Sequence, residues 1–265
     1  MSLVQHCSRF ITLLMCVFAL TGCGGFKKGE LEPKEKVDRA TYHYNLAYGH
    51  YFDSTNKNVD ASLQELLRSL EYKPDYPEAH FLAGLIYLGR ANHGLAIRHF
   101  QTAIRLRPAY YAAKNNLGAA YLSEGRWDDA ISVFQELVGE IKYATPGHGH
   151  NNLGWAWFKK GAFDKAEKSF RLALTMNPRL CQAYNNLGQV LFERGKAEQA
   201  EKYLRRGIKR CKRYAEPHFH LGKLYLANRK RVQALSSFDE CVKLSGDSQL
   251  GDRCRAMSKS LGGQR

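Results

Sequence analysis

Proline and acidic side chains are both scarce in this 265-residue chain. It has only 7 Pro, and 25 Asp plus Glu against 40 Lys plus Arg, for a formal net charge of +15. Hydrophobic residues make up 44% of the chain, so the composition excludes a disordered, a collagen-like and a multi-span membrane protein. The length allows one or two domains with a sizeable core. Few prolines and recurring Leu-Gly pairs predict a core made of helices in series.

The short motifs that carry catalysis are also missing. The chain contains no nucleophile elbow, phosphate-binding loop, HExxH or CxxC. His148 and His150, like His218 and His220, are two residues apart, and on a helix this spacing turns the side chains about 200° from each other. We therefore predict no enzyme activity, no metal site and no cofactor.

The N-terminal segment 1–22 has no acidic residue, and its apolar run ends at Leu20. The run is too short to span a bilayer and is typical of a secretory signal. It leads into Leu20-Thr21-Gly22-Cys23, which resembles the lipobox of bacterial lipoproteins. The resemblance implies removal of residues 1–22, acylation of Cys23, sorting to the outer membrane because no Asp follows, and a flexible tether over 23–38. The alternative is an ordinary signal peptide with an incidental cysteine.

A pattern of about 34 residues fills the rest of the chain. Small-residue pairs recur at intervals of 34, 36, 34 and 34 residues, and end in Gly84, Gly118, Gly154, Gly188 and Gly222. If this Gly is position 8 of a unit, position 20 is always Ala, position 24 is Phe or Leu, and position 32 is Pro in three units. Small residues let two antiparallel helices cross closely, while the large ones fill the space beside the crossing. This period is typical of a helix-turn-helix array.

These positions resemble the tetratricopeptide repeat over almost the whole chain after the signal. The resemblance implies an all-α fold, a right-handed α-solenoid with a polar-faced capping helix. We expect about six repeats, at residues 39–76, 77–110, 111–146, 147–180, 181–214 and 215–248, followed by a capping helix and tail at 249–265.

Two repeats depart from the pattern. The first has Leu46-Ala47 in place of Leu-Gly and about three extra residues within 53–59. Two extra residues fall within 142–149, where we expect Pro146, Gly147 and Gly149 to replace a tight turn. The superhelix should therefore bend or hinge between repeats three and four.

The first helix of each repeat is expected to line a concave face through positions 2, 5, 9 and 12. Aromatic rings give apolar area at low entropic cost, and amides between them satisfy peptide groups, so this face suits a peptide from another protein. Packing of the rings against the neighbouring helix is the alternative. The candidate groove consists of Tyr44, Tyr48, Tyr51, Phe81, Leu85, Asn115, Leu122, Asn151, Trp155, Phe158, Asn185, Gln189, Phe192 and Phe219.

Basic residues concentrate between residues 194 and 231, with thirteen Lys and Arg against three Glu. A solvated helix face explains such a run, and so does an acidic partner or an anionic envelope polymer. Nucleic acid would need the same charge, but the secretory signal argues against that partner.

Four cysteines remain after the signal and Cys23, and four thiols allow three pairings. Cys181 and Cys211 are symmetric about the turn of repeat five, and Cys241 and Cys254 about the next turn. Residues symmetric about a turn lie opposite each other in an antiparallel helix pair. We therefore predict these two disulfides in an oxidising compartment, with free buried thiols as the alternative.

A lipobox, a short polar tether and six tetratricopeptide units together resemble the pilotin lipoproteins of type IV pili. The resemblance implies a protein at the periplasmic face of the outer membrane, held by the lipid on Cys23, that binds secretin subunits and promotes their assembly into the pilus pore. The alternative is a scaffold for another envelope machine, such as outer-membrane protein assembly or cell-wall synthesis.

Overall fold

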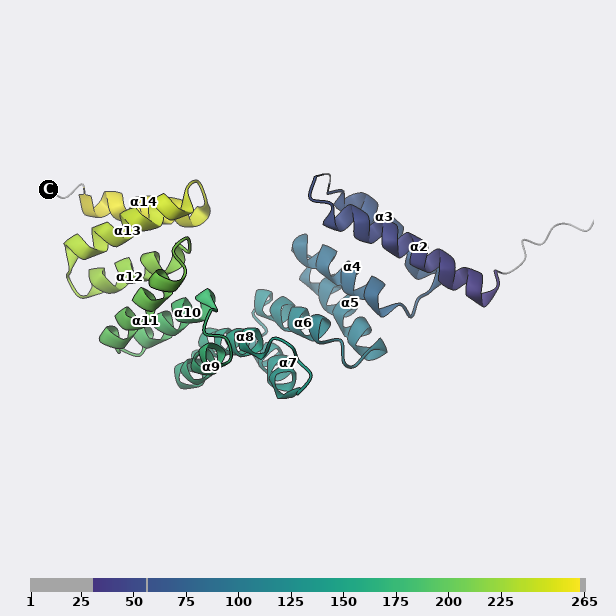
Figure 1. Cartoon of the computed structure of the whole chain (residues 1–265), viewed down its shortest axis with the longest axis horizontal. Coiled ribbons are helices and arrows are strands. Elements are labelled where there is room, and N and C mark those ends of the chain that lie inside the picture. The colour runs from purple at the N-terminus through teal and green to yellow at the C-terminus, as the bar shows by residue number, and fades with distance from the viewer. Residues whose placement is uncertain (1–30, 56, 263–265) are drawn as a thin grey trace, which may run out of the picture.

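The computed structural model describes residues 31–55 and 57–262, which form thirteen α-helices (Figure 1). They pack as six consecutive antiparallel pairs followed by one further helix, so the predicted tetratricopeptide-type solenoid with a capping helix is confirmed. Residues 1–22 and Cys23 lie outside the described residues. The helices are α2 (Pro33–Phe52), α3 (Val59–Tyr72), α4 (Pro77–Gly89), α5 (His93–Leu106), α6 (Tyr111–Ser123), α7 (Trp127–Gly139), α8 (Pro146–Lys159), α9 (Phe163–Met176), α10 (Cys181–Glu193), α11 (Ala197–Arg210), α12 (Glu216–Ala227), α13 (Arg231–Ser245) and α14 (Gln249–Gly262).

Position 8 is the contact point inside each helix pair. A Cβ atom added at Gly84 would lie 2.4 Å from the ring of Phe100, the residue at position 24 of the same repeat. The same overlap occurs in the other four repeats that have Gly at this position. Glycine therefore lets the second helix approach closely enough to bury the large side chain at position 24 completely. These side chains are Phe100, Phe134, Phe170, Leu204 and Phe238.

The turn within repeats two to six reverses the chain in three residues. The middle residue has a positive φ in every case: Gly at 125, 161 and 195, but Ala91 (56°) and Arg229 (59°) in the other two. A left-handed backbone costs an L-residue about 1–2 kcal/mol. Hydrogen bonds such as Asn92 N–H to Tyr87 O (2.9 Å) hold the turn in place.

The first helix begins earlier than expected, because α2 starts at Pro33, inside the segment 23–38 that was predicted to be a flexible tether. Proline favours the first turn of a helix, and Arg39 pairs with Glu35 one turn away at 2.7 Å. Ala40 is fully buried, and its carbonyl accepts a hydrogen bond from Ser69 Oγ of α3 (2.7 Å). Packing on α3 thus extends the helix into the polar segment.

The expected loop at Pro146, Gly147 and Gly149 is also corrected. The extra residues precede α8, Pro146 is its first residue, and both glycines are buried within the helix. A Cβ at Gly147 would lie 2.8 Å from Asn177 Cβ, and one at Gly149 would lie 2.8 Å from the Tyr143 ring. These glycines are therefore packing positions. Trp157 packs against the core on both sides of this junction, so the core is continuous between repeats three and four.

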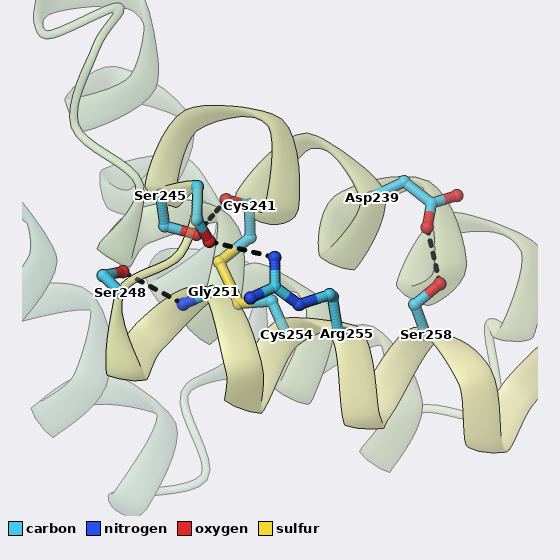
Figure 2. Close-up of a disulfide and its surroundings, with 9 residues drawn as sticks. Asp239, Cys241, Ser245, Ser248, Gly251, Cys254, Arg255 and Ser258 are labelled. Atoms are coloured by element: carbon cyan, nitrogen blue, oxygen red, sulfur yellow. Dashed lines mark hydrogen bonds between the residues drawn. A yellow bond between two sulfur atoms is a disulfide. The ribbon is translucent and has the colours of Figure 1, made fainter.

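The capping helix α14 is joined to α13 by the disulfide Cys241–Cys254 (Figure 2). Arg255 donates to Gly246 O (3.0 Å), and Ser258 donates to Asp239 Oδ1 (2.5 Å). The second predicted disulfide, Cys181–Cys211, links the start of α10 to the residue after α11. Both predicted pairs are therefore present.

Candidate functional site: the concave aromatic surface

The helix array is curved, and α4, α6, α8 and α10 lie on the inner side of the curve with their partner helices outside (Figure 1). The first helices of repeats two to five therefore form the concave side of the array, where the candidate groove was predicted. The structure divides the candidate residues into three groups: a cluster in repeats one and two, a pair in repeat four, and buried residues that connect repeats.

The N-terminal aromatic cluster consists of Tyr44, Tyr48, Tyr51, Phe52 and Tyr76. The ring centroids of Tyr48 and Phe52 are 4.4 Å apart, and those of Tyr44 and Tyr76 are 5.1 Å apart. Tyr48 and Phe52 remain 48% and 52% exposed, because no repeat precedes α2 in the described part of the chain. Burial raises the pKa of Tyr44 to about 12, and the nearby hydroxyls of Tyr110 and Tyr76 add to this effect.

Two members of this region were not predicted. Phe52 follows Tyr48 by one helical turn, a spacing that places both on one face. Tyr76 lies just before α4, outside the positions that the repeat pattern assigns to the groove. Both rings lie close to the end of a helix, and such rings are missed when only positions 2, 5, 9 and 12 of each repeat are considered.

Phe81 and Leu85 continue the surface into repeat two. The Phe81 ring lies 4.9 Å from Tyr110 and 5.9 Å from Phe100, and Leu85 packs against the core on both sides of α4. Both are half-buried. They connect the aromatic cluster to the core and leave part of their surface open.

Repeat four contributes the central aromatic pair, Trp155 and Phe158. Their rings stack at 5.3 Å, and the Lys159 ammonium lies 4.9 Å from the Trp155 ring. Phe158 also contacts Phe163 at 5.5 Å. Both members of the pair are half-buried, as are Leu122, Gln189 and Phe192.

The asparagines form a hydrogen-bonded chain across repeats three to five. Asn186 donates to Asn151 (3.1 Å), and Asn152 donates to Asn115 (3.0 Å). Within α10 and α8, Asn185 donates to Asn186 (3.3 Å) and Asn151 to Asn152 (3.4 Å). Asn151 and Asn185 are each 5% exposed. The amides therefore join neighbouring repeats to each other.

Phe219 lies at the C-terminal end of the array, where it is 6% exposed. Its ring is 6.1 Å from Phe238, and the Arg253 guanidinium of α14 lies 4.5 Å from it. Burial lowers the pKa of the adjacent His220 to about 4, and the charges of Lys223 and Arg253 lower it further. The capping helix thus contacts Phe219, the residue of repeat six that was predicted to line the groove.

Two classes of function find no support in the described residues. No group of three or more His, Cys, Asp and Glu in residues 31–55 and 57–262 is placed to hold a metal ion. None of the helices there is both long and apolar enough to cross a bilayer. What the described residues do offer is partly exposed apolar area on the rings of Tyr48, Phe52 and Trp155.

Tetratricopeptide-repeat family models match residues 82–148, 147–180 and 180–219. With the paired helices of the whole array, these matches make the chain a tetratricopeptide-repeat protein, a fold that is typically non-catalytic.

Solved structures with this fold include two proteins of pilus biology. The chain is similar to PilW, a type IV pilus biogenesis factor, with a TM-score of 0.70 and 18% identity over 81% of this chain and 97% of that one. It is similar to PilF of Pseudomonas aeruginosa with a TM-score of 0.66 and 17% identity over 83% and 98% of the two chains. Yeast Tom70 has a TM-score of 0.64 and 15% identity, over 89% of this chain and 56% of Tom70. At these identities the likeness shows the fold.

One curated relative is the tetratricopeptide repeat-containing protein trd-1 of Caenorhabditis elegans. It is 27% identical over 124 residues, which make up 47% of this chain and 16% of trd-1. The match therefore spans about a sixth of that relative's length.

Proposed function

We propose that this protein is an outer-membrane pilotin lipoprotein of type IV pilus biogenesis. It would bind secretin subunits through its concave aromatic surface and promote their assembly into the pilus pore. The lipid on Cys23 would hold it at the periplasmic face of the outer membrane.

The observation that carries this proposal is the combination of the lipobox-like residues 20–23 with a repeat array that has about the same length as PilW and PilF. The array corresponds to 97% of PilW and 98% of PilF, so the paired helices account for nearly the whole of both proteins. The two disulfides support an oxidising, extracytoplasmic location.

The exposed aromatic surface supports the binding part of the proposal. Tyr48 and Phe52 are about half exposed although they are large and apolar, and Trp155 offers a half-buried ring at the middle of the curve. Half-buried aromatic anchors are typical of residues that dominate a binding energy. Because Asn151 and Asn185 are each only 5% exposed, and Asn151 accepts a hydrogen bond from Asn186 of the next repeat, the rings rather than the amides would hold the partner.

The second candidate function is a scaffold for another envelope assembly machine. The observation that favours it is the range of proteins with this fold, which includes MamA, Tom70 and Cut9. A generic scaffold would use the same concave surface for a different peptide.

The test is Trp155→Ala in cells that make a type IV pilus. We expect fewer assembled secretin multimers on immunoblots of unheated membranes, because truncation of a central aromatic costs about 2 kcal/mol or more, roughly thirtyfold in affinity. Met176→Ala is the matched control, since Met176 is 54% exposed on the outer helix α9. Lys209→Glu should also have a smaller effect than Trp155→Ala.

Helicity and membrane location of each variant are measured alongside, so that misfolding is recognised. If deletion of the whole gene leaves secretin multimers and pilus-dependent motility intact, the pilotin proposal fails and the scaffold takes its place.

A further inference from the structure

A basic crevice lies on the outer side of repeat five, between α9, α10 and α11. It consists of two adjoining cavities of about 400 Å³ and about 510 Å³, which share Tyr184 and Arg206. Leu174 and Leu187 line the first cavity, and Lys209 and Arg210 line the second. The crevice therefore combines an apolar part with a rim of cations.

Most of these cations have no carboxylate partner. Arg206, Lys209 and Arg210 are exposed and form no ion pair with any of the residues that the structure describes. Lys209 and Arg210 lie in the last turn of α11, where the helix dipole is negative and favours positive charge. Their charge is thus available to a ligand.

Arg171, at the opposite side of the crevice, differs because Glu167 binds it at 2.8 Å. Burial would raise the pKa of Glu167, but hydrogen bonds from Arg171 and Lys196 outweigh burial and hold this pKa below its ordinary value. The carboxylate is therefore ionised and committed to its own neighbours, which leaves the rim next to α11 positive.

The walls of the crevice are held in position by a disulfide, by close packing and by hydrogen bonds. The Cys181–Cys211 disulfide joins the start of α10 to the end of α11. Tyr184 packs so closely on α11 that a Cβ at Gly207 would lie 3.1 Å from Tyr184 Cβ, and its hydroxyl donates to Pro178 O (3.2 Å). Arg171 donates to the hydroxyl of Tyr203 (2.8 Å). A ligand would meet a largely preformed site.

We infer that this crevice binds an acidic segment of a partner protein. An apolar side chain of the segment inserts beside Leu174 and Tyr203, above the buried Leu187, and flanking carboxylates pair with Arg206, Lys209 and Arg210. Guanidinium groups bind carboxylates through two parallel hydrogen bonds, so both charge and shape are matched. A single side chain fits between two helices, whereas a flat lipid surface does not reach Leu174.

This inference is independent of the proposed function, because the crevice is built mainly on α9 and α11, which lie outside the curve (Figure 1), whereas the proposed aromatic surface is built on α2, α4 and α8. The acidic segment is bound whether or not the concave surface is occupied, and each site has its own variants.

The test uses the purified, disulfide-bonded protein and a fluorescein-labelled heptapeptide in which one Phe is flanked by three acidic residues on each side. Binding is measured by fluorescence anisotropy at low and high salt. We expect the double variant Arg206→Glu, Lys209→Glu to weaken peptide affinity by about tenfold or more. The double variant Arg206→Gln, Lys209→Gln should weaken the affinity by a smaller factor. The helical circular dichroism should stay unchanged.

The matched control is Lys202→Glu with Lys212→Glu. It makes the same change in net charge, but at two exposed residues that form no ion pairs with the described residues and lie outside the crevice. Long-range charge effects are screened by salt, so we expect peptide affinity to fall by less than about threefold. An equal loss in both double variants would mean a diffuse electrostatic effect and would overturn the site.

Two further outcomes also contradict the inference. The first is equally tight binding of a peptide with Ser in place of Phe, since the apolar part of the crevice would then have no role. The second is that the peptide does not bind, whereas vesicles that contain phosphatidylglycerol do bind, and the Arg206→Glu, Lys209→Glu variant loses this vesicle binding. The crevice would then be a lipid-headgroup site.

Discussion

Individual glycines decide how closely the helices of a repeat approach. Five repeats place a glycine against a fully buried Phe or Leu, with no room for a methyl group. The first repeat has Ala47 instead, and there Leu66 replaces the ring and Ser62 Oγ donates to Ala47 O (2.7 Å). The degenerate repeat thus combines Ala at position 8 with Leu at position 24 and with a side-chain hydrogen bond between its two helices.

Two glycines in α4 allow a matched prediction. Gly84→Ala places a Cβ 2.4 Å from the Phe100 ring, and overpacking of a core costs typically 1–3 kcal/mol, so we expect a loss of about that size. Gly89→Ala, in the same helix, has no atom within 4 Å of the added Cβ. It should leave the stability unchanged or raise it by about 0.5–1 kcal/mol. Urea unfolding followed by circular dichroism measures both, and equal midpoints for the two variants would refute the close-contact explanation.

Whole helices at the two ends of the array are stabilised differently. At the N-terminal end, α2 exposes Tyr48 and Phe52 to solvent. At the C-terminal end, α14 is fastened by a disulfide and by hydrogen bonds from Arg255 and Ser258 (Figure 2). A terminal helix has a neighbour on one side only and frays more easily than an internal one. The cross-link therefore acts where the array is weakest.

Removal of the Cys241–Cys254 disulfide should loosen α14 selectively. A loop of about 15 residues closed by a disulfide is worth about 3 kcal/mol in the chain-entropy model. We expect Cys241→Ser with Cys254→Ser to increase amide hydrogen exchange in residues 249–262 while repeats two to four keep their protection. Cys181→Ser with Cys211→Ser is the control and should leave α14 protected. If peptide mapping of periplasmic material without reductant finds all four thiols free, the disulfides do not form in the cell.

Across the whole molecule, the candidate aromatic and basic residues lie on different helices of one curved array. Tyr48 and Phe52 belong to α2 and Trp155 to α8, whereas Arg206 and Lys209 belong to α11, an outer helix (Figure 1). Two separate surfaces let one protein contact two partner segments at once, which raises the effective concentration of each for the other. If both proposed sites are occupied together, the protein would act as an assembly factor rather than as a receptor for a single ligand.

Attachment to a membrane is the prediction that belongs to the whole molecule. Each buried acyl CH₂ adds about 0.8 kcal/mol, so a multiply acylated Cys23 anchors the protein stably without a transmembrane helix. Cys23→Ala should leave the protein free in the periplasm or uncleaved at the inner membrane, as measured by fractionation and immunoblotting. Outer-membrane recovery at the wild-type level would contradict lipidation, and the concave and basic surfaces would then act from another location.

Much of the fold could be predicted from the sequence alone, because each repeat is stabilised mainly by contacts between residues close in sequence. A helix pair of 34 residues forms nearly all its contacts within itself and with its neighbour, so Gly84, Ala96 and Phe100 reveal their roles by spacing. The same symmetry predicted both disulfides, since residues equidistant from a turn lie opposite each other. The helical composition of residues 249–261 likewise predicted the capping helix that α14 forms.

The candidate site depended on contacts that spacing does not encode. Position numbers placed Asn151, Asn185 and Phe219 in one groove with Tyr48 and Trp155, but only packing decides which of them stay open to a partner. Asn151 and Asn185 are buried, Asn151 accepts a hydrogen bond from Asn186 of the next repeat, and Phe219 is covered by Arg253 of α14. In the same way Pro146, Gly147 and Gly149, which suggest a loop by residue type, fit inside α8 because α9 and Tyr143 approach it closely. Side-chain accessibility is set jointly by neighbouring helices, and therefore only the tertiary structure could decide it.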